Sequence, residues 1–369
     1  MRKIVLYVPS MTSGGAERVI VNLANEMSKH IDLDIYIATR FEGVNTKFVT
    51  ERVKIIDIRE KSLFNFAKYL NKLKPDVVLS TSTSNIRVTA LKFLLLFNRT
   101  LYLTRAANIY YPWTSKYYKG FKSKLGAYLM KVAYKYSDGV MSNSPDTEKS
   151  LMSSGIHNIV KTIGNPVFYM SDINQDAEKP GDVISPYIVY VGSFKSQKRV
   201  DLLLEVFLKL SQKIDINLVM VGDGVDYNNK EKAQSYICDN GLQKKVFMVG
   251  RKSDLAGYYK HARCFVLCSE YEGFGNVIVE SLAYGTPVAC FDCPGGPNFI
   301  LGKNEFGQLV KFGDTNMLAQ KIYDVLTSRI VYDTSELKRR ASCFSVESIT
   351  KQYLDCIKDS YFRKYCVAF

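Results

Sequence analysis

The chain has 369 residues, of which 47% are hydrophobic and 23% charged. This composition excludes a disordered, collagen-like or disulfide-scaffold protein, and the length favours two domains. The net charge of +14 lies mostly in residues 1–180, which hold 26 Lys and Arg against 15 Asp and Glu. Unless it is only a basic surface, this half predicts a polyanionic partner: anionic lipid, nucleic acid or a phosphorylated substrate.

Residues 3–8 form the first predicted strand. Their apolar run ends at Pro9, too early for a signal peptide, and no run approaches the roughly 18 residues of a membrane-spanning helix. We therefore expect a cytoplasmic protein. Gly14 and Gly15 separate this strand from a helix over residues 16–27, whose apolar positions recur with a period near 3.6. Backbone N–H groups at such a turn suit a phosphate, although a tight turn explains the glycines nearly as well.

Strands and helices continue to alternate through the first half. The further predicted strands are residues 33–38, 53–58, 76–80, 101–104, 139–143 and 159–163. This pattern predicts an α/β fold with a doubly wound parallel sheet over residues 1–168.

A polar segment follows, and we interpret residues 169–186 as a linker. A second strand–helix series over 187–345 predicts another Rossmann-like domain, and 346–369 a terminal helix packing back toward the first domain. Its predicted strands are residues 187–191, 217–221, 246–249, 264–268, 287–291 and 308–310. Two such halves should face a cleft, with ligands at the carboxyl ends of the strands.

Residues 112–137 are basic and aromatic and contain no acid. Their lysines are Lys116, Lys119, Lys122, Lys124, Lys131 and Lys135. Cations among amphipathic aromatics suit an anionic membrane interface. A nucleic-acid face also fits the charge, but no nucleic-acid motif is found, and an ordinary helix with lysines on its wet side is the third interpretation.

Two loops of the second half carry candidate anion-binding groups. Lys198 and Arg199 precede a helix that begins near Asp201, and Lys198 can reach an anion held at its start, although a solvated loop is the plain alternative. Residues 222–224 begin like a dinucleotide fingerprint but lack the third glycine, which favours a turn over a nicotinamide site.

Residues 269–287 are the most informative segment. Glu272, Gly273 and Gly275 fill a turn after a strand, and a helix is predicted from Asn276 to about residue 284. Glu280 lies two helical turns further on, so both carboxylates can face one cleft. A carboxylate accepts hydrogen bonds from vicinal hydroxyls such as those of ribose.

All eight cysteines lie after residue 237, which excludes a secreted disulfide framework. Cys264 with Cys268, and Cys290 with Cys293, have spacings seen in zinc sites. However, Cys264, Val266 and Cys268 alternate, which predicts one buried face of a strand. We favour reduced core thiols over zinc.

The block Glu272-x7-Glu280, followed by Ala283-x-Gly285-x-Pro287-Val288, resembles glycosyltransferase family 4. Further matches are Gly-Gly-Ala-Glu-Arg at 14–18, Gly-Asn-Pro-Val at 164–167, Lys198 with Asp201-Leu202-Leu203, Val249-Gly250 and Cys-Pro-Gly-Gly-Pro at 293–297. The resemblance spans nearly the whole chain. It implies the GT-B architecture of two Rossmann-like domains, with retaining, metal-independent transfer from a nucleotide-sugar.

The resemblance also implies roles for individual residues. Glu280 should hold the donor ribose. Glu272 and the backbone of Gly273, Phe274 and Gly275 should face the transferred sugar. Lys198 and the Gly14-Gly15 loop should hold the diphosphate, and Gly250 with Arg251 should lie against the base. The remaining expected donor-site residues are Ser193, Arg199, Asn276 and Val277.

Three positions depart from the family pattern. Ser193 stands where an Arg is usual, so either Lys195 or Arg199 substitutes for that cation or a different loop geometry serves. The segment 104–108 lacks the histidine of many members, and Arg105 becomes the candidate catalytic residue. Phe299 occupies the place of a common Glu.

The resemblance implies a UDP-sugar as the favoured donor. With the basic, aromatic segment 112–137, it leads us to expect a lipid-linked or oligosaccharide acceptor, in cell-surface glycan synthesis on the inner face of the membrane. Leaving-group charge would be stabilised by Lys198 and helix N-termini, without a metal cofactor. Asp32-x-Asp34 resembles the metal motif of other glycosyltransferases but begins a strand. The alternatives are a nucleotide-sugar 2-epimerase, which the scarcity of histidine disfavours, and a non-catalytic nucleotide-sugar-binding subunit.

Overall fold

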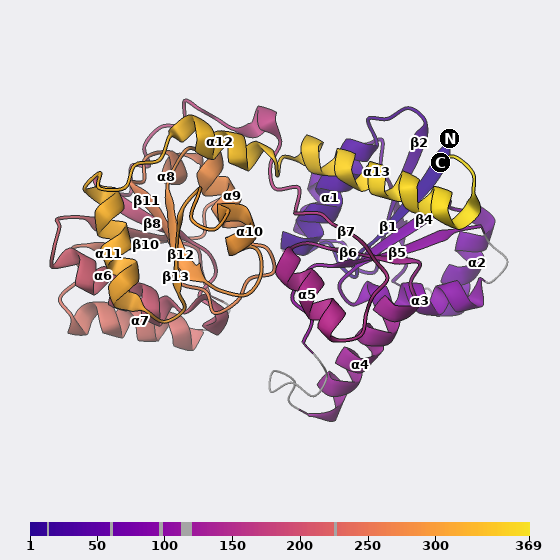
Figure 1. The fold of residues 1–369 in the computed structure, drawn as a ribbon, viewed down its shortest axis with the longest axis horizontal. Coiled ribbons are helices and arrows are strands. Elements are labelled where there is room, and N and C mark those ends of the chain that lie inside the picture. The colour runs from indigo at the N-terminus through magenta and orange to yellow at the C-terminus, as the bar shows by residue number, and fades with distance from the viewer. Residues whose placement is uncertain (13–14, 60–61, 96–98, 112–119, 225–226) are drawn as a thin grey trace. The chain divides into compact units, whose positions relative to one another are not determined.

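Strands and helices alternate along the chain in a computed structural model, which describes residues 1–12, 15–59, 62–95, 99–111, 120–224 and 227–369 (Figure 1). The chain divides into two units. The first combines residues 1–167 with 345–369, and the second is residues 168–344. Residues 169–186, which we interpreted as a linker, are thus part of the second unit, and the terminal helix is part of the first.

The first unit is built on a parallel sheet with the order β3-β2-β1-β4-β5-β6-β7. Its strands are β1 (Arg2–Tyr7), β2 (Leu33–Thr39), β3 (Lys54–Asp57), β4 (Val77–Thr81), β5 (Leu101–Ala106), β6 (Gly139–Ser142) and β7 (Ile159–Thr162). Its helices are α1 (Gly15–Met27), α2 (Leu63–Leu73), α3 (Ser84–Leu94), α4 (Phe121–Tyr136), α5 (Pro145–Ser153) and α13 (Val346–Tyr365).

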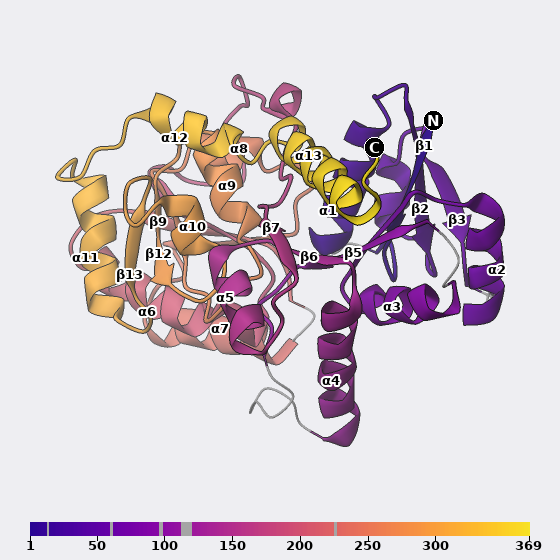
Figure 2. The same ribbon diagram turned by 45° about the vertical axis from the view of Figure 1, so that its right-hand side comes forward.

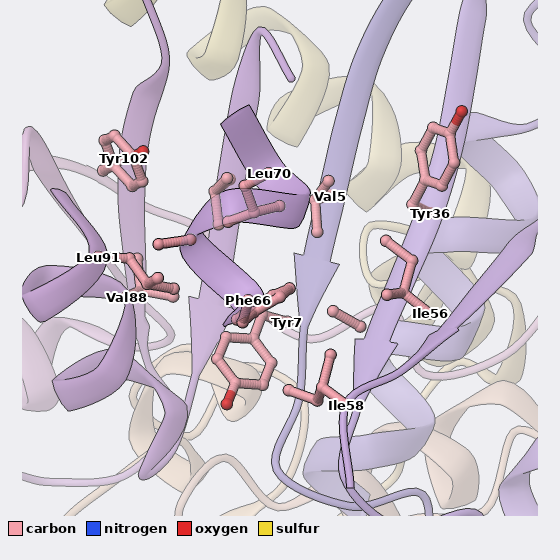
Figure 3. Close-up of a cluster of buried hydrophobic side chains, with 13 residues drawn as sticks. Val5, Tyr7, Tyr36, Ile56, Ile58, Phe66, Leu70, Val88, Leu91 and Tyr102 are labelled. Atoms are coloured by element: carbon pink, nitrogen blue, oxygen red, sulfur yellow. The ribbon is translucent and has the colours of Figure 1, made fainter. Parts of the chain in front are cut away.

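Helices cover both faces of this sheet. On one face α2 and α3 pack over a cluster of buried side chains that includes Tyr7, Phe66 and Tyr102, shown in Figure 3. The opposite face is covered by α1 and α13, which pack against each other, and α13 also contacts β5 and β7 (Figure 2). Burial on both faces explains why these strands are apolar runs rather than alternating ones.

The second unit has a parallel sheet with the order β10-β9-β8-β11-β12-β13. Its strands are β8 (Tyr187–Val191), β9 (Asn217–Val221), β10 (Val246–Gly250), β11 (Cys264–Leu267), β12 (Val288–Asp292) and β13 (Gln308–Lys311). Its helices are α6 (Val200–Ser211), α7 (Tyr227–Asp239), α8 (Ala256–Lys260), α9 (Asn276–Ala283), α10 (Pro297–Leu301), α11 (Thr315–Leu326) and α12 (Thr334–Ser342).

All predicted strands are present, with ends within two residues of the predicted ones, and the doubly wound parallel class is confirmed in both units. One detail was wrong. Every residue of β11 is buried, including Phe265 and Leu267, so the alternation of Cys264 and Val266 does not mark a single buried face. The strand lies in the middle of the sheet, where helices cover both of its faces. Among the described residues, no helix is long and apolar enough to cross a membrane.

Candidate active site

The candidate active site lies at the carboxyl edge of the second sheet, where the strand order reverses. Because β8 lies between β9 and β11, the chain leaves β8 and β11 toward opposite sides of the sheet. The loops that follow these two strands, residues 192–199 and 268–275, therefore meet. Ligands of open α/β sheets bind at such a switch point.

Lys198 and Glu272 join these loops through a buried ion pair. Lys198 Nζ lies 2.6 Å from Glu272 Oε1, and the two side chains are only 16% and 7% exposed. Ser269 donates to the same carboxylate oxygen at 2.6 Å. A pair this sheltered from water keeps its geometry and retains most of its electrostatic strength. Lys198 thus presents a fixed cation at the switch point.

Backbone contacts hold the two loops and a third one together. The Glu270 N–H donates to the Gln197 carbonyl at 2.9 Å, and the Gln197 side chain donates to the Tyr271 carbonyl at 2.6 Å. The Glu272 N–H donates to the Pro294 carbonyl at 3.0 Å. The site is therefore a rigid junction of three strand-to-helix connections.

Two glycines of the third loop are required by close packing. A Cβ on Gly296 would collide with the Phe274 carbonyl, and one on Gly295, where φ is +131°, would collide with the Glu272 carbonyl. Only glycine permits this approach. Gly295 and Gly296 of the Cys-Pro-Gly-Gly-Pro motif thus pack directly against the backbone of the Glu272 loop.

The loop ends in the start of α9. Gly275 precedes the helix with φ +95°, and it leaves the first N–H groups of α9 at the carboxyl edge of the sheet. Phe274 is buried and packs its ring edge-on against Phe299 and Phe344, with centroids 6.4 and 5.5 Å away. Its side chain is therefore held in the protein interior, and the expectation that its backbone faces the transferred sugar stays a prediction.

Glu280 lies on the second turn of α9. Its side chain is partly buried, and Tyr259 of α8 donates a hydrogen bond to Glu280 Oε2 at 2.7 Å. Burial raises the pKa of Glu280, whereas the hydrogen bond from Tyr259 lowers it. Glu272 and Glu280 thus come from the turn and the helix of one connection, as expected, and differ in partner: one is paired with a cation, the other with a phenol.

The end of β10 completes this edge of the sheet. Gly250 has φ +70°, and its carbonyl accepts a hydrogen bond from the Gly222 N–H at 2.8 Å. Arg251 follows it and is exposed, and Val277 on α9 is partly exposed. Gly222, with φ +138°, packs against the Gly192 carbonyl. Residues 222–224 have no regular secondary structure.

Family models match both halves of the chain. The model described as Glycosyltransferase Family 4 matches residues 13–168, and the one described as Glycosyl transferases group 1 matches residues 172–342. A lipopolysaccharide core biosynthesis glycosyltransferase, LpsE of Rhizobium meliloti, is 30% identical over 254 residues, 65% of this chain and 71% of the relative. The chain belongs to glycosyltransferase family 4.

Other relatives align over nearly their whole length. A Campylobacter jejuni enzyme named N-acetylgalactosamine-N,N'-diacetylbacillosaminyl-diphospho-undecaprenol 4-alpha-N-acetylgalactosaminyltransferase is 24% identical over 96% of this chain and 99% of its own. Among solved structures, Anabaena Alr3699/HepE in complex with UDP and glucose has a TM-score of 0.79 at 17% identity, over 97% of this chain and all of that one. This likeness confirms the GT-B fold, and the chain is a glycosyltransferase.

Ser193, where the resemblance led us to expect an Arg, is partly exposed. The Ser193 carbonyl accepts a hydrogen bond from Tyr190 Oη at 3.0 Å. The substitutes we considered are Lys195, which is exposed, and Arg199, whose guanidinium is held by Asp201 at 2.7 Å. Lys195, Arg199 and Asp201 line a cavity of about 470 Å³ between α6 and α7. Lys198 is the cation that the structure brings to Glu272.

Phe299, in the place of a common family Glu, belongs to an aromatic cluster. Its ring packs against Phe274 and Phe344, and its carbonyl accepts a hydrogen bond from Arg340. The Arg340 guanidinium also lies 5.0 Å from the Phe344 ring. Phe299 thus packs against Phe274, beside the Glu272 loop.

Arg105, the candidate catalytic residue of the first unit, lies at the end of β5 and is 1% exposed. Its guanidinium donates to Tyr353 Oη at 2.9 Å, to Thr81 Oγ1 at 3.3 Å and to the Asn165 side chain. These partners give it a structural role that joins β5 to α13, and a catalytic role stays a prediction.

Of the two glycines expected near the diphosphate, Gly15 begins α1, and Gly14 lies outside the described residues.

Lys122 and Lys124 lie exposed on the first turn of α4, whereas Lys116 and Lys119 fall outside the described residues.

The cysteines with metal-like spacing are free thiols in the core of the second unit: Cys264, Cys268, Cys290 and Cys293. Burial raises the pKa of the Cys264 thiol to about 12. In the part of the chain that the structure describes, no group of three or more His, Cys, Asp or Glu is placed to hold a metal ion.

Sequence reasoning missed the supporting residues of the site. Ser269 and Gln197 bond the Glu272 loop, and Tyr259 bonds Glu280 from another helix. Ser269, three residues before Glu272 and directly after the predicted strand, could have been suspected as its partner. Nothing in the sequence pairs Tyr259 with a glutamate 21 residues away.

Proposed function

We propose that this glycosyltransferase moves a sugar from a nucleoside diphosphate sugar, with UDP-sugars as the first candidates, to a lipid-linked glycan, with retention and without a metal. The observation that carries the donor part is the Lys198–Glu272 pair at the switch point, beside the start of α9 and with Glu280 on the same helix.

The charges of this site suit departure of a diphosphate. As the glycosidic bond breaks, negative charge grows on the leaving phosphate. Lys198 and the positive end of the α9 dipole stabilise that charge. Glu272 orients Lys198 and accepts hydrogen bonds from the sugar, and Glu280 accepts from the ribose hydroxyls. The leaving phosphate takes the proton of the acceptor hydroxyl on the same face, which retains the anomeric configuration.

The donor and acceptor classes are supported by relatives. The printed name of the Campylobacter jejuni enzyme describes transfer to a saccharide on diphospho-undecaprenol, and the Anabaena structure contains UDP and glucose. A Salmonella typhimurium relative named lipopolysaccharide 1,6-galactosyltransferase is 22% identical over 86% of this chain and 88% of its own. The Anabaena complex thus supports a UDP-sugar donor, and the two enzyme names support a glycolipid acceptor.

A face of the first unit suits an acceptor that sits in a membrane. At about 100° per residue, Phe121, Leu125, Tyr128, Leu129 and Tyr136 share one sector of α4. Each is exposed, with Phe121 at 79%. Lys122 borders this sector on one side and Lys124, Lys131 and Lys135 border it on the other. An exposed apolar stripe flanked by lysines is typical of helices that lie in the interface of anionic membranes. We propose that the enzyme lies on the membrane that carries its acceptor, on the cytoplasmic side, and this face of α4 supports the membrane contact.

The proposal is tested by nucleoside diphosphate release from a panel of UDP-, GDP- and ADP-sugars, with EDTA and with membrane lipid extract as acceptor. We expect turnover of one donor class that requires the extract and is unchanged by EDTA. Loss of turnover in EDTA would overturn metal independence. Isomerised donor without transfer would favour the epimerase, and donor binding without turnover on any acceptor would favour a binding subunit.

A further inference from the structure

Two neighbouring tyrosines of α8 each donate a hydrogen bond to a carboxylate. Tyr259 Oη lies 2.7 Å from Glu280 Oε2, and Tyr258 Oη lies 2.7 Å from Asp182 Oδ1. Only the first of these carboxylates belongs to the candidate active site. Tyr258, which binds a carboxylate outside the candidate site, can therefore serve as a control for Tyr259 on the same short helix.

Tyr259 is held in place from several sides. Its side chain is 1% exposed, and its ring stacks on that of Tyr284 with centroids 6.1 Å apart and planes within 11°. Its carbonyl accepts a hydrogen bond from Thr286 Oγ1 at 2.6 Å. A buried phenol that is fixed in this way has one position for its hydroxyl, and that position is at Glu280.

We propose that Tyr259 is a positioning residue of the donor site: by binding Glu280 Oε2 it fixes the carboxylate and leaves Oε1 to accept from the vicinal hydroxyls of the ligand's ribose. This inference rests on the proposed function, in which Glu280 contacts the ribose. It adds a residue that acts through Glu280 and does not touch the ligand itself.

The electrostatics of α9 agree with this role. Burial raises the pKa of Glu280, and the hydrogen bond from Tyr259 opposes that shift. Among the described residues, Tyr259 from α8 donates to Glu280, and the ring of Tyr284, at the end of α9, stacks on that of Tyr259. From α12, the Lys338 side chain lies near Gly285 and donates to Gln175 at 2.6 Å. Without the Tyr259 hydroxyl, the pKa of Glu280 moves further up. On acidification, Glu280 then becomes protonated at a higher pH than in the parent protein.

Tyr259→Phe removes only the hydroxyl and keeps the ring stack. The experiment measures the dissociation constants of UDP, GDP and ADP by calorimetry from about pH 5 to pH 8, for the parent and this variant. For the nucleotide that the parent binds, we expect Tyr259→Phe to weaken binding about tenfold at pH 7, with the fall in affinity on acidification displaced to higher pH. In turnover, KM should rise while kcat changes little.

Tyr258→Phe is the matched control, because it loses a similar hydrogen bond from the same helix. It should bind and titrate like the parent, while thermal melts show whether the two variants lose similar stability. Glu280→Gln separates the two proposals. If the parent binds none of the nucleotides, or if Glu280→Gln binds as well as the parent, the proposed donor site fails and this inference fails with it. If Glu280→Gln is weakened while Tyr259→Phe matches Tyr258→Phe in affinity and pH profile, only the positioning role of Tyr259 is overturned.

Discussion

Replacing Lys198 with methionine separates the structural and chemical contributions of the buried ion pair. The variant leaves the Glu272 carboxylate, 7% exposed, with Ser269 as its remaining side-chain donor. Removing one partner of a buried pair costs about 3–5 kcal/mol of unfolding free energy. Because Ser269 still donates and Lys198 itself is 16% exposed, we expect about 3 kcal/mol for Lys198→Met, measured by urea unfolding at neutral pH.

Adding Glu272→Gln removes the stranded charge. A neutral pair of similar volume is often as stable as a buried ion pair, so the double variant should regain most of the lost stability, to within about 1 kcal/mol of the parent. Activity should not return, because the cation that faces the leaving diphosphate is still missing. Loss of one such group lowers kcat by about 10² to 10³, measured as nucleoside diphosphate release at saturating donor.

The pattern across the variants decides between the interpretations. Glu272→Gln alone should keep a larger share of activity than Lys198→Met, since Lys198 remains. A Lys198→Met enzyme with kcat within about threefold of the parent would refute the role of Lys198 in stabilising the leaving group. Recovery of activity together with stability in the double variant would refute it as well, because it would mean that the pair serves only to hold the loop.

Gly296→Ala should lose donor binding and at least about 2 kcal/mol of stability, because the new methyl group meets the Phe274 carbonyl; an unchanged melting temperature would contradict this packing. Lys122→Glu with Lys124→Glu should weaken the affinity for anionic vesicles, measured by sedimentation, by at least about 30-fold, because two lysines at about 1 kcal/mol each contribute about 2 kcal/mol. Release from a water-soluble acceptor should be unchanged; equal vesicle binding would argue against the membrane face. Arg105→Lys should lower stability by about 2 kcal/mol at unchanged nucleotide affinity, whereas a loss of kcat at parental stability would establish a catalytic role.

The fold was predictable because its signals are local. Buried parallel strands are short apolar runs, and the helices between them show a period near 3.6, so every strand could be placed to within two residues. The core of the candidate site was predictable for a related reason. Lys198 and Glu272 follow strands that are adjacent in a doubly wound sheet, and Glu280 follows Glu272 on the same connection.

What could not be predicted depends on which distant side chain fills the space beside each of these residues. Arg105 became the catalytic candidate because its segment, 104–108, lacks the histidine expected from the family resemblance. Its partners, however, are Thr81 on β4, Asn165 and, 248 residues away on α13, Tyr353. Likewise, the sequence shows no partner for Glu280, whereas in the structure Tyr259 donates a hydrogen bond to its carboxylate. In both cases the charged residue is evident from the sequence. A tyrosine hydroxyl that bonds it, Tyr353 for Arg105 and Tyr259 for Glu280, is not, because a neutral hydroxyl leaves no periodic or charged pattern. Yet these hydroxyls help to determine whether the charged group can bind a ligand. A hydroxyl that shares a buried charge should therefore be sought in the structure before that charge is assigned to catalysis.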